Sequence, residues 1–256
     1  MRLVSGFAAA IAVAALATST IGAQGRAGAP PPPAAGQDEG PSKAIAGGGI
    51  TVPGWTGKVD AGEEKAGLSV KDAKLAPQGA DLHVTTGPAT TYWNPANKAS
   101  GDYTVSATFT EKEYMGLNDH PHPYGIVIAG NDLGTPTMSA LYCSAYGNGT
   151  FIVRGFGPDP FQASARRPTA NDAVHKAGAG SEGAGTPAAK GKPVTQEIAM
   201  SVKGDKVSCI INGTEVASFT KAELVVPGKL KSTDGVYGIR FAHNTDAIVT
   251  GFKITK

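Results

Sequence analysis

Residues 140–155 read ALYCSAYGNGTFIVRG, two apolar runs joined by residues that suit a tight turn between antiparallel strands. A three-residue loop over 147–149 pairs Cys143 with Val153, whereas a two-residue turn pairs Cys143 with Arg154. A slip of one residue moves every side chain to the other face of a sheet, so the two registers bury different residues. Burial favours the three-residue loop, because that register keeps the arginine out of the core.

The favoured register gives this hairpin an inward and an outward face. Cys143 points inward, and the outward face carries Tyr142, Tyr146, Ile152 and Arg154. Aromatic rings can cover the apolar side of a pyranose, and a guanidinium donates hydrogen bonds in a fixed fork. The outward face is therefore a candidate ligand surface, and the alternative is that its tyrosines only cover the edge of the core.

A second hairpin, KVSCIINGTEVASF at residues 206–219, has an Asn-Gly turn of two residues and directs Cys209 inward. The chain contains 2 cysteines, so Cys143 is the one partner available to Cys209 within the chain. In an oxidising compartment the two residues can form a disulfide. The alternative is a pair of buried free thiols that behave as small apolar side chains.

Period-two alternation dominates the rest of the chain. Residues 102–110, DYTVSATFT, place apolar side chains on one face and hydroxyls on the other, and residues 197–203, EIAMSVK, repeat the pattern. With 35 glycines and 18 prolines, many turns and few long helices are expected. The roughly ten to thirteen short strands predict an all-β fold, a two-sheet antiparallel jelly-roll sandwich with little helix.

The N-terminal region differs in composition from the rest of the chain. Residues 1–23 combine a positive start, a short apolar run and a small residue at a cleavage position, which is typical of a secretory signal peptide. Residues 24–49 are rich in Pro, Gly and Ala and predict a disordered linker. Residues 50–256 then form a single β-sandwich domain, with a mobile low-complexity loop at about 158–193.

These features predict a secreted or periplasmic protein. No segment after the signal peptide is apolar and long enough to predict a membrane span. The formal net charge of +2 does not indicate attraction to nucleic acid.

Several stretches, taken in order, resemble a known superfamily. They include HVTTGPATTYWNP at 83–95, HPYGIVIAGNDL at 122–133 and GVYGIRFAHNTDAIVTGF at 235–252. Together with the two Asn-Gly hairpins they resemble secreted bacterial domains of the concanavalin A-like lectin/glucanase superfamily, in particular laminin G-like and 3-keto-disaccharide hydrolase-type domains. The resemblance covers residues 55–256 and implies a jelly roll. That fold carries lectins, hydrolases and adhesive modules, so the resemblance does not fix the activity.

The sequence departs from the glucanases of this superfamily in its acidic residues. Those enzymes place carboxylates along one strand in an ExDxxE-like pattern, because glycoside cleavage needs two carboxyl groups that flank the bond. That spacing is not found here, and the nearest pair is Glu111 and Glu113. They come where a strand gives way to a loop, so we interpret them as solvated charges.

The candidate ligand surface extends to residues from other segments. One aromatic residue lies in each of two neighbouring segments, and an arginine and a histidine lie on a strand that can join the same sheet. The full candidate set is Trp93, Tyr124, Tyr142, Tyr146, Arg154, Arg240 and His243.

A metal site is the second candidate, in NDHPHP at residues 118–123. Asp119, His120 and His122 can supply ligands, and imidazole suits zinc and similar ions. A closed site needs about four ligands, however, and the sequence does not place His243 or another histidine beside this loop. The alternative is a rigid loop that rims one sheet.

The resemblance also implies a structural calcium ion, because the superfamily often carries one. Asp132 and Asp246 are the candidate oxygen donors. Each has a single neighbouring Asn or Asp rather than the several closely spaced ones that a calcium loop shows.

Three functions are compatible with these features. The first is a secreted, non-catalytic module that binds carbohydrate, a cell-envelope component or another extracytoplasmic partner on one sheet face. The second is a glycan-processing hydrolase of the 3-keto-disaccharide hydrolase type, and the third is a structural envelope domain. No G-x-S-x-G, Walker-type glycine loop or C-x-x-C motif is present in the sequence, so nothing selects another enzyme class.

Overall fold

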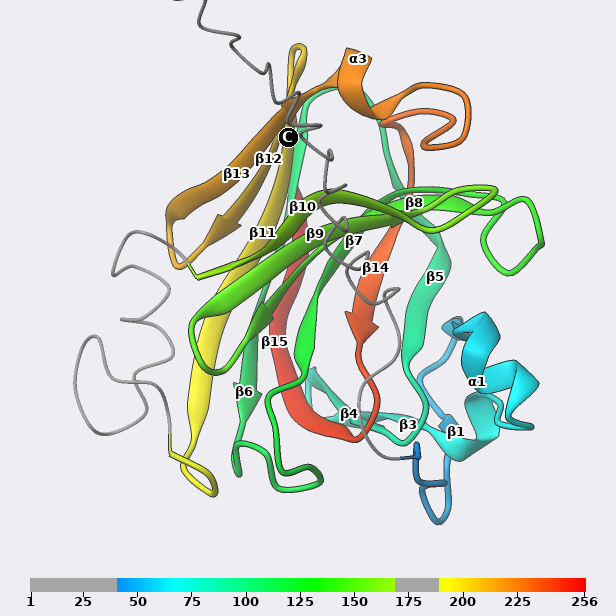
Figure 1. Cartoon of the computed structure of the whole chain (residues 1–256), viewed down its shortest axis with the longest axis vertical. Coiled ribbons are helices and arrows are strands. Elements are labelled where there is room, and N and C mark those ends of the chain that lie inside the picture. Colours follow the sequence, from blue (N-terminus) through cyan, green and yellow to red (C-terminus); the bar gives the residue numbers. More distant parts are fainter. Residues whose placement is uncertain (1–40, 169–188) are drawn as a thin grey trace, which may run out of the picture. The chain divides into compact units, whose positions relative to one another are not determined.

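A computed structural model describes residues 41–168 and 189–256 (Figure 1). The expected signal peptide at 1–23 and most of the expected linker lie outside the described residues. Within the described part, no helix has the length and apolar composition needed to cross a bilayer.

The described chain forms two β-sheets that pack face to face as an antiparallel sandwich, as the sequence predicted. The eight-stranded sheet contains, in spatial order, β1 (Gly49–Ile50), β3 (Lys74–Gln78), β4 (Asp81–Thr86), β15 (Thr245–Thr255), β6 (Tyr103–Glu111), β11 (Val194–Lys203), β12 (Lys206–Ile211) and β13 (Thr214–Thr220). The seven-stranded sheet contains β10 (Phe161–Pro168), β9 (Thr150–Phe156), β8 (Ser139–Tyr146), β7 (Pro123–Asn131), β14 (Gly235–Phe241), β5 (Thr90–Ala99) and β2 (Thr56–Val59).

Helix contributes little to the described part of the chain. Two short α-helices, α1 (Ala61–Lys65) and α3 (Lys221–Leu224), and one 3₁₀ turn at Val70–Asp72 lie in connections. All strand pairs are antiparallel except β1 with β3.

The register of β8 against β9 is the one that burial favoured. Cys143 pairs with Val153, and the three-residue loop contains Gly149 at a φ of 85°. Cys143 forms a disulfide with Cys209 on β12, with a Cα–Cα distance of 5.9 Å. Since β8 and β12 belong to different sheets, the disulfide joins the two layers through the core.

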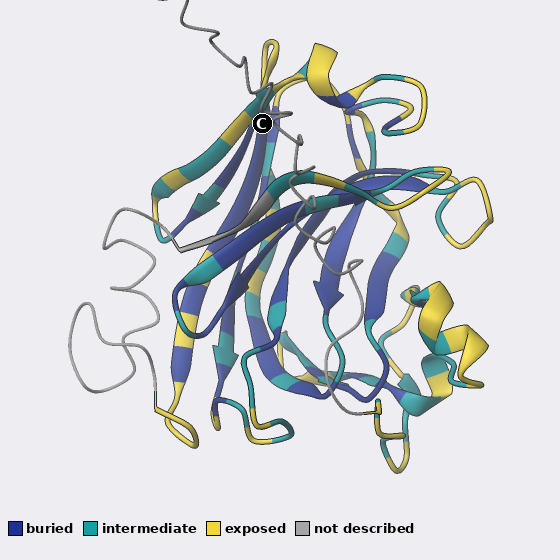
Figure 2. Cartoon of the chain, viewed as in Figure 1, coloured by how far each residue is buried: buried dark blue, intermediate teal, exposed yellow. Residues whose placement is uncertain are grey.

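Strand β6 shows the simple alternation that its sequence predicted. Its buried residues alternate with half-buried ones, and side chains such as Val105 and Phe109 pack between the sheets. Strand β8 differs, because all eight of its residues are buried (Figure 2). The seven-stranded sheet therefore carries a second apolar layer on its outer face, formed by Val127, Tyr142, Ile152 and their neighbours.

Two expected boundaries are wrong. Residues 43–49, expected in the linker, are tied to the domain: Ile45 N–H donates to the Asp72 carbonyl at 2.9 Å, and Lys43 N–H donates to Asn244 Oδ1 at 3.0 Å. The expected loop at 158–193 contains strand β10, which pairs with β9 as the edge of its sheet. The rest of that expected loop, 169–188, lies outside the described residues.

Candidate functional site

The outer face of the seven-stranded sheet brings most of the predicted ligand residues together. A row of paired positions runs across five strands, from Trp93 through Gly238, Val127 and Tyr142 to Arg154. Neighbouring strands lie about 4.8 Å apart, so residues next to each other in this row are in side-chain reach. The figure shows the sheet to be strongly twisted, because β8 and β9 run across the view while β14 and β5 run along it (Figure 1).

Arg240 lies on this face and is held by a carboxylate. Its guanidinium donates to both Asp60 oxygens at 2.8 and 2.5 Å, and to Thr91 Oγ1 at 3.0 Å. Burial lowers the pKa of Arg240, but the Asp60 carboxylate outweighs this effect and the net pKa is raised. The Arg240 donors are thus engaged within the protein, which leaves this residue a positioning role at the face.

The tyrosines of this face form a packed layer rather than an open platform. Tyr142 is 7% exposed, because the Arg240 guanidinium lies 4.7 Å from its ring centroid and the Phe156 ring lies 5.4 Å from it. Burial raises the pKa of the Tyr142 hydroxyl. Tyr146 is also 7% exposed and packs in the same apolar layer. The expectation that these residues leave the core between the sheets is confirmed, but their rings are already covered.

Arg154 has an unsatisfied donor. It is half-buried, and its Nε is buried without a hydrogen-bond partner in the described structure. It pairs across the strands with Tyr142 on one side and Gln162 on the other. A buried donor without an acceptor costs free energy, so this guanidinium is under-satisfied in the described structure.

Two aromatic residues of the predicted set are placed differently from expectation. Tyr124 is fully buried between the sheets, with its ring centroid 5.3 Å from that of Phe109, so its place on the ligand face was wrong. The reason is the alternation of β7, which turns Tyr124 inward and Gly125 outward. Trp93 does face outward but is 6% exposed, beside Gly134 of the β7–β8 connection.

The two acidic residues considered for catalysis, Glu111 and Glu113, differ in their exposure to solvent. Glu113 is exposed, but Glu111 is 5% exposed and continues the inward face of β6, so its interpretation as a solvated charge was wrong. Burial raises its pKa to about 8, partly offset by the nearby Tyr124 hydroxyl and the Met115 backbone. Glu111 is therefore a neutral acid in the core at pH 7.

The predicted metal residues divide into one cluster and two ion pairs. His120, His122 and His243 come together, and their potential ligand atoms all lie within 4.8 Å of one another. His243, which had been assigned to the ligand surface, is thus part of a histidine cluster. Asp119 accepts a hydrogen bond from His120 Nδ1 at 2.8 Å, and this bond lowers the pKa of the Asp119 carboxyl.

The carboxylates proposed for calcium are engaged with cationic or polar side chains. Asp132 pairs with Lys231, and Asp246 accepts hydrogen bonds from Thr85 Oγ1 at 2.6 Å and from His83 Nε2 at 3.1 Å. Within the described ranges neither belongs to a group of three or more His, Cys, Asp or Glu ligands. The two carboxylates do not come together as a calcium site.

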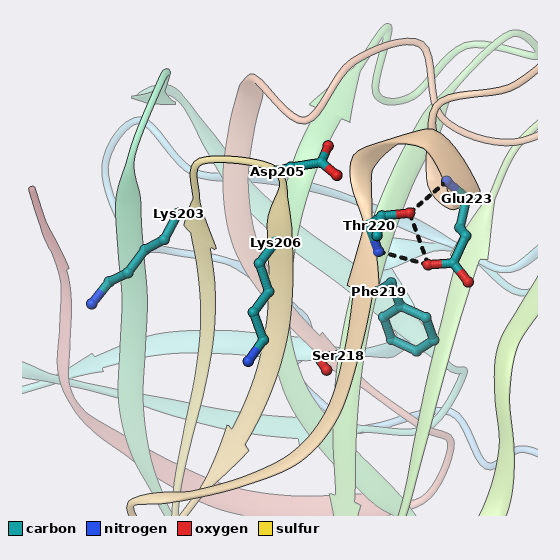
Figure 3. A pocket seen from close by; sticks show the side chains of 7 residues that line it. All are labelled: Lys203, Asp205, Lys206, Ser218, Phe219, Thr220 and Glu223. Carbon is teal, nitrogen blue, oxygen red and sulfur yellow. Dashed lines mark hydrogen bonds between the residues drawn. The ribbon is translucent and has the colours of Figure 1, made fainter.

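An open pocket of about 380 Å³ lies apart from these groups, along β12 and β13 (Figure 3). Several of its polar groups are already paired: Thr220 and Glu223 form a capping box at the start of α3, and Lys206 Nζ lies 2.7 Å from Glu215, which is outside the pocket lining. In Figure 3 the Lys203 and Lys206 side chains point away from Glu223, so the pocket does not gather charged groups around one point.

The fold is similar to that of several solved structures. Neither a protein-family model nor a curated protein sequence matches the chain. The carbohydrate binding module CBM66 from Bacillus subtilis has 9% identity and a TM-score of 0.49, over 81% of this chain and 98% of that chain. The endo-β-1,3-glucanase from Pyrococcus furiosus has 10% identity and a TM-score of 0.47, over 79% and 88%.

A protein of unknown function with a galectin-like fold from Bacillus subtilis has 14% identity and a TM-score of 0.46, over 78% of this chain and 88% of that chain. At such identities the likeness concerns the β-sandwich and not the ligand.

Proposed function

We propose that this chain is a secreted, non-catalytic β-sandwich module that binds a glycan on the outer face of the seven-stranded sheet. The observation that carries the proposal is the position of Arg154. Its buried, unpartnered Nε lies on the same face as the ring of Tyr142, which pairs with it across the strands. A glycan offers hydroxyl and ring oxygens as acceptors, and its apolar ring face suits aromatic neighbours.

The packed layer beside Arg154 gives this position a rigid wall. Tyr142, Phe156 and Arg240 contact one another, and Asp60 fixes the guanidinium of Arg240. Side chains that are already ordered lose little entropy on binding, so a preorganised wall favours affinity. We place the ligand at the β8–β9 side of the face, where Arg154 and Gln162 are neighbours.

The hydrolase alternative makes different demands on the site. Glycoside cleavage by acid and nucleophile or base requires two carboxyl groups on either side of the scissile bond. Asp60, the carboxylate beside this face, is bound by Arg240, and Glu111 lies in the core. The disulfide between Cys143 and Cys209 is in keeping with an oxidising compartment, which supports the secreted part of the proposal.

An array of α- and β-linked oligosaccharides tests the proposal, with wild-type chain and the variant Arg154→Met. Methionine keeps most of the apolar stem but removes the donors, so binding should weaken at least tenfold. Lys203→Met, an exposed cation on the other sheet, is the matched control and should bind as wild type. Binding that survives Arg154→Met would overturn the assigned face. Release of reducing sugar from 3-keto-disaccharides or β-glucans would favour the hydrolase instead.

A further inference from the structure

Three histidines from two separate connections meet at one end of the sandwich. His120 and His122 belong to the segment between β6 and β7, and His243 belongs to the turn between β14 and β15 (Figure 1). The ring centroids of His120 and His122 lie 4.3 Å apart, and those of His122 and His243 lie 4.1 Å apart. The adjacency of β7 and β14 in the sheet brings the two connections together.

Each imidazole contacts an oxygen through its Nδ1 atom. His120 Nδ1 lies 2.8 Å from the Asp119 carboxylate, and His122 Nδ1 lies 2.5 Å from the carbonyl oxygen of His243. Both oxygens can only accept, so each Nδ1 carries the proton. Asn118 Nδ2 also lies 2.8 Å from His122 Nδ1, but the shorter contact to a carbonyl oxygen requires the proton on the ring.

The third histidine is held in the same way through a serine. His243 Nδ1 lies 3.2 Å from Ser42 Oγ, and Ser42 Oγ donates its proton to Glu63 Oε1 at 2.7 Å. Because the hydroxyl has a single proton, it must accept from His243. With the proton on Nδ1, Nε2 is the atom of each ring that can act as an acceptor. This outer layer of carboxylate, carbonyl and hydroxyl is the usual support of metal-binding histidines.

The Nε2 atoms of His120 and His122 face each other at 2.5 Å. Two acceptor lone pairs at this distance repel unless a cation lies between them. A proton fits this distance, whereas a zinc ion, with Zn–N bonds of about 2.0–2.1 Å, requires the two atoms to move apart to about 3.3 Å. A single proton can bridge two of the rings, whereas a metal ion also uses the third ring, which is stacked on His122. Imidazole nitrogen is the donor that zinc and its first-row neighbours prefer.

We propose that His120, His122 and His243 bind a divalent ion of the zinc class. The nearby carboxylates of Asp119 and Glu63 offset its charge. Prolines at 121 and 123 restrict the backbone around the two loop histidines, so the site loses little entropy on binding. His120 is half-buried, so this ligand lies toward solvent, from which water can supply a fourth ligand.

The ion has a defined place relative to the outer face. The segment from Asp60 to Glu63 contacts both the outer face and the histidine cluster. Asp60 binds Arg240 on the outer face, and Glu63 accepts a hydrogen bond from Ser42, which contacts His243. The metal would thereby fasten the β6–β7 connection and the β14–β15 turn to the segment before β1. Metal binding does not depend on the proposed glycan site, so either proposal can fail without the other.

Titration of untagged full-length chain with Zn²⁺ after chelator treatment tests the site, because an affinity tag of histidines would itself bind metal. Calorimetry should show one ion per chain. His120→Ala and His243→Ala should each weaken binding at least tenfold. His83→Ala is the matched control, since His83 pairs with Asp246 away from the cluster, and it should bind as wild type.

A second readout separates loss of ligands from loss of fold. Co²⁺ should give visible absorption bands on wild-type chain and on His83→Ala, and the bands should be absent from His120→Ala, whose side chain is half-buried rather than buried like that of His122. Far-ultraviolet circular dichroism identifies any variant that fails to fold. The proposal would be overturned if wild type, at a protein concentration of about 1 μM, showed no saturable zinc binding with zinc added up to about 100 μM. Equal binding by both cluster variants would overturn it as well.

Discussion

Glu111 should make the stability of this protein depend strongly on pH. The change to test is Glu111→Gln, which keeps the size of the side chain but removes its titration. The folded pKa is raised from the ordinary 4.5 to about 8 by burial, and Oε2 is buried without a hydrogen-bond partner in the described structure. The protonated acid is therefore the form that the folded chain accepts.

The sign of the effect follows from the two pKa values. Below pH 4.5 both folded and unfolded chains are protonated at this position, and Glu111 carries no penalty. Between 4.5 and about 8 the unfolded chain ionises while the folded chain keeps its proton, so the free energy of unfolding falls by about 1.4 kcal/mol per pH unit. Over roughly 3.5 pH units the loss reaches at most about 5 kcal/mol, since relaxation and water entry reduce it.

Urea denaturation of wild type and Glu111→Gln at pH 5, 6.5 and 8 measures this loss. The variant should gain stability relative to wild type as the pH rises, by about 2–4 kcal/mol between pH 5 and pH 8. Glu113→Gln is the control, because that side chain is exposed two residues away, and its profile should parallel that of wild type. If the wild-type and Glu111→Gln profiles run parallel within about 0.5 kcal/mol, the carboxyl is ionised in the folded state and the reasoning is wrong.

Three further changes test the contacts that hold the seven-stranded sheet in place, each measured by urea denaturation. Replacing Cys143 and Cys209 by alanine removes the cross-link between residues 66 positions apart and should lower the free energy of unfolding by about 4 kcal/mol. Equal stability of oxidised and reduced wild type would contradict this. Asp60→Asn leaves the buried Arg240 guanidinium without its anion and should lower the free energy of unfolding by about 2 kcal/mol. This figure is discounted because 32% of the Asp60 side chain is exposed. A change below about 0.5 kcal/mol would mean that solvent replaces the carboxylate. Gly238→Ala puts a Cβ 2.1 Å from a backbone oxygen of β5 and should cost about 1–3 kcal/mol, which unchanged stability would refute.

Local pattern was sufficient to predict which way most strand residues face. The β8–β9 register followed from keeping Arg154 out of the core, and it correctly put Cys143 inside and Tyr142 outside. The same rule fails for Tyr124, because β7 is buried on both faces and its apolar run shows no alternation to set the phase. Its neighbour Gly125 faces outward at a position where an added Cβ would lie 1.8 Å from the Cys143 carbonyl oxygen, a close approach that the sequence alone does not reveal.

The burial of Glu111 is the second feature that the local sequence pattern could not predict. Glu111 continues the alternation of β6 by one more inward position, but charged residues are usually placed outside in a sequence-based interpretation. The core accepts it in the protonated form, which burial favours, beside Tyr124 of the other sheet. No pattern within β6 contains that partner.

The histidine cluster depends on strand order rather than on strand faces. His122 and His243 are separated by 121 positions, and each lies just beyond the end of its strand, so neither inward nor outward preference applies. They meet because β14, although late in the sequence, inserts next to β7, and antiparallel pairing sets the end of β14 beside the start of β7. Once Phe241 is paired with Tyr124, the next residues of the two connections have to lie together. The strand order is thus the missing information, because it brings His243 beside the loop that the sequence already marked as a candidate metal site.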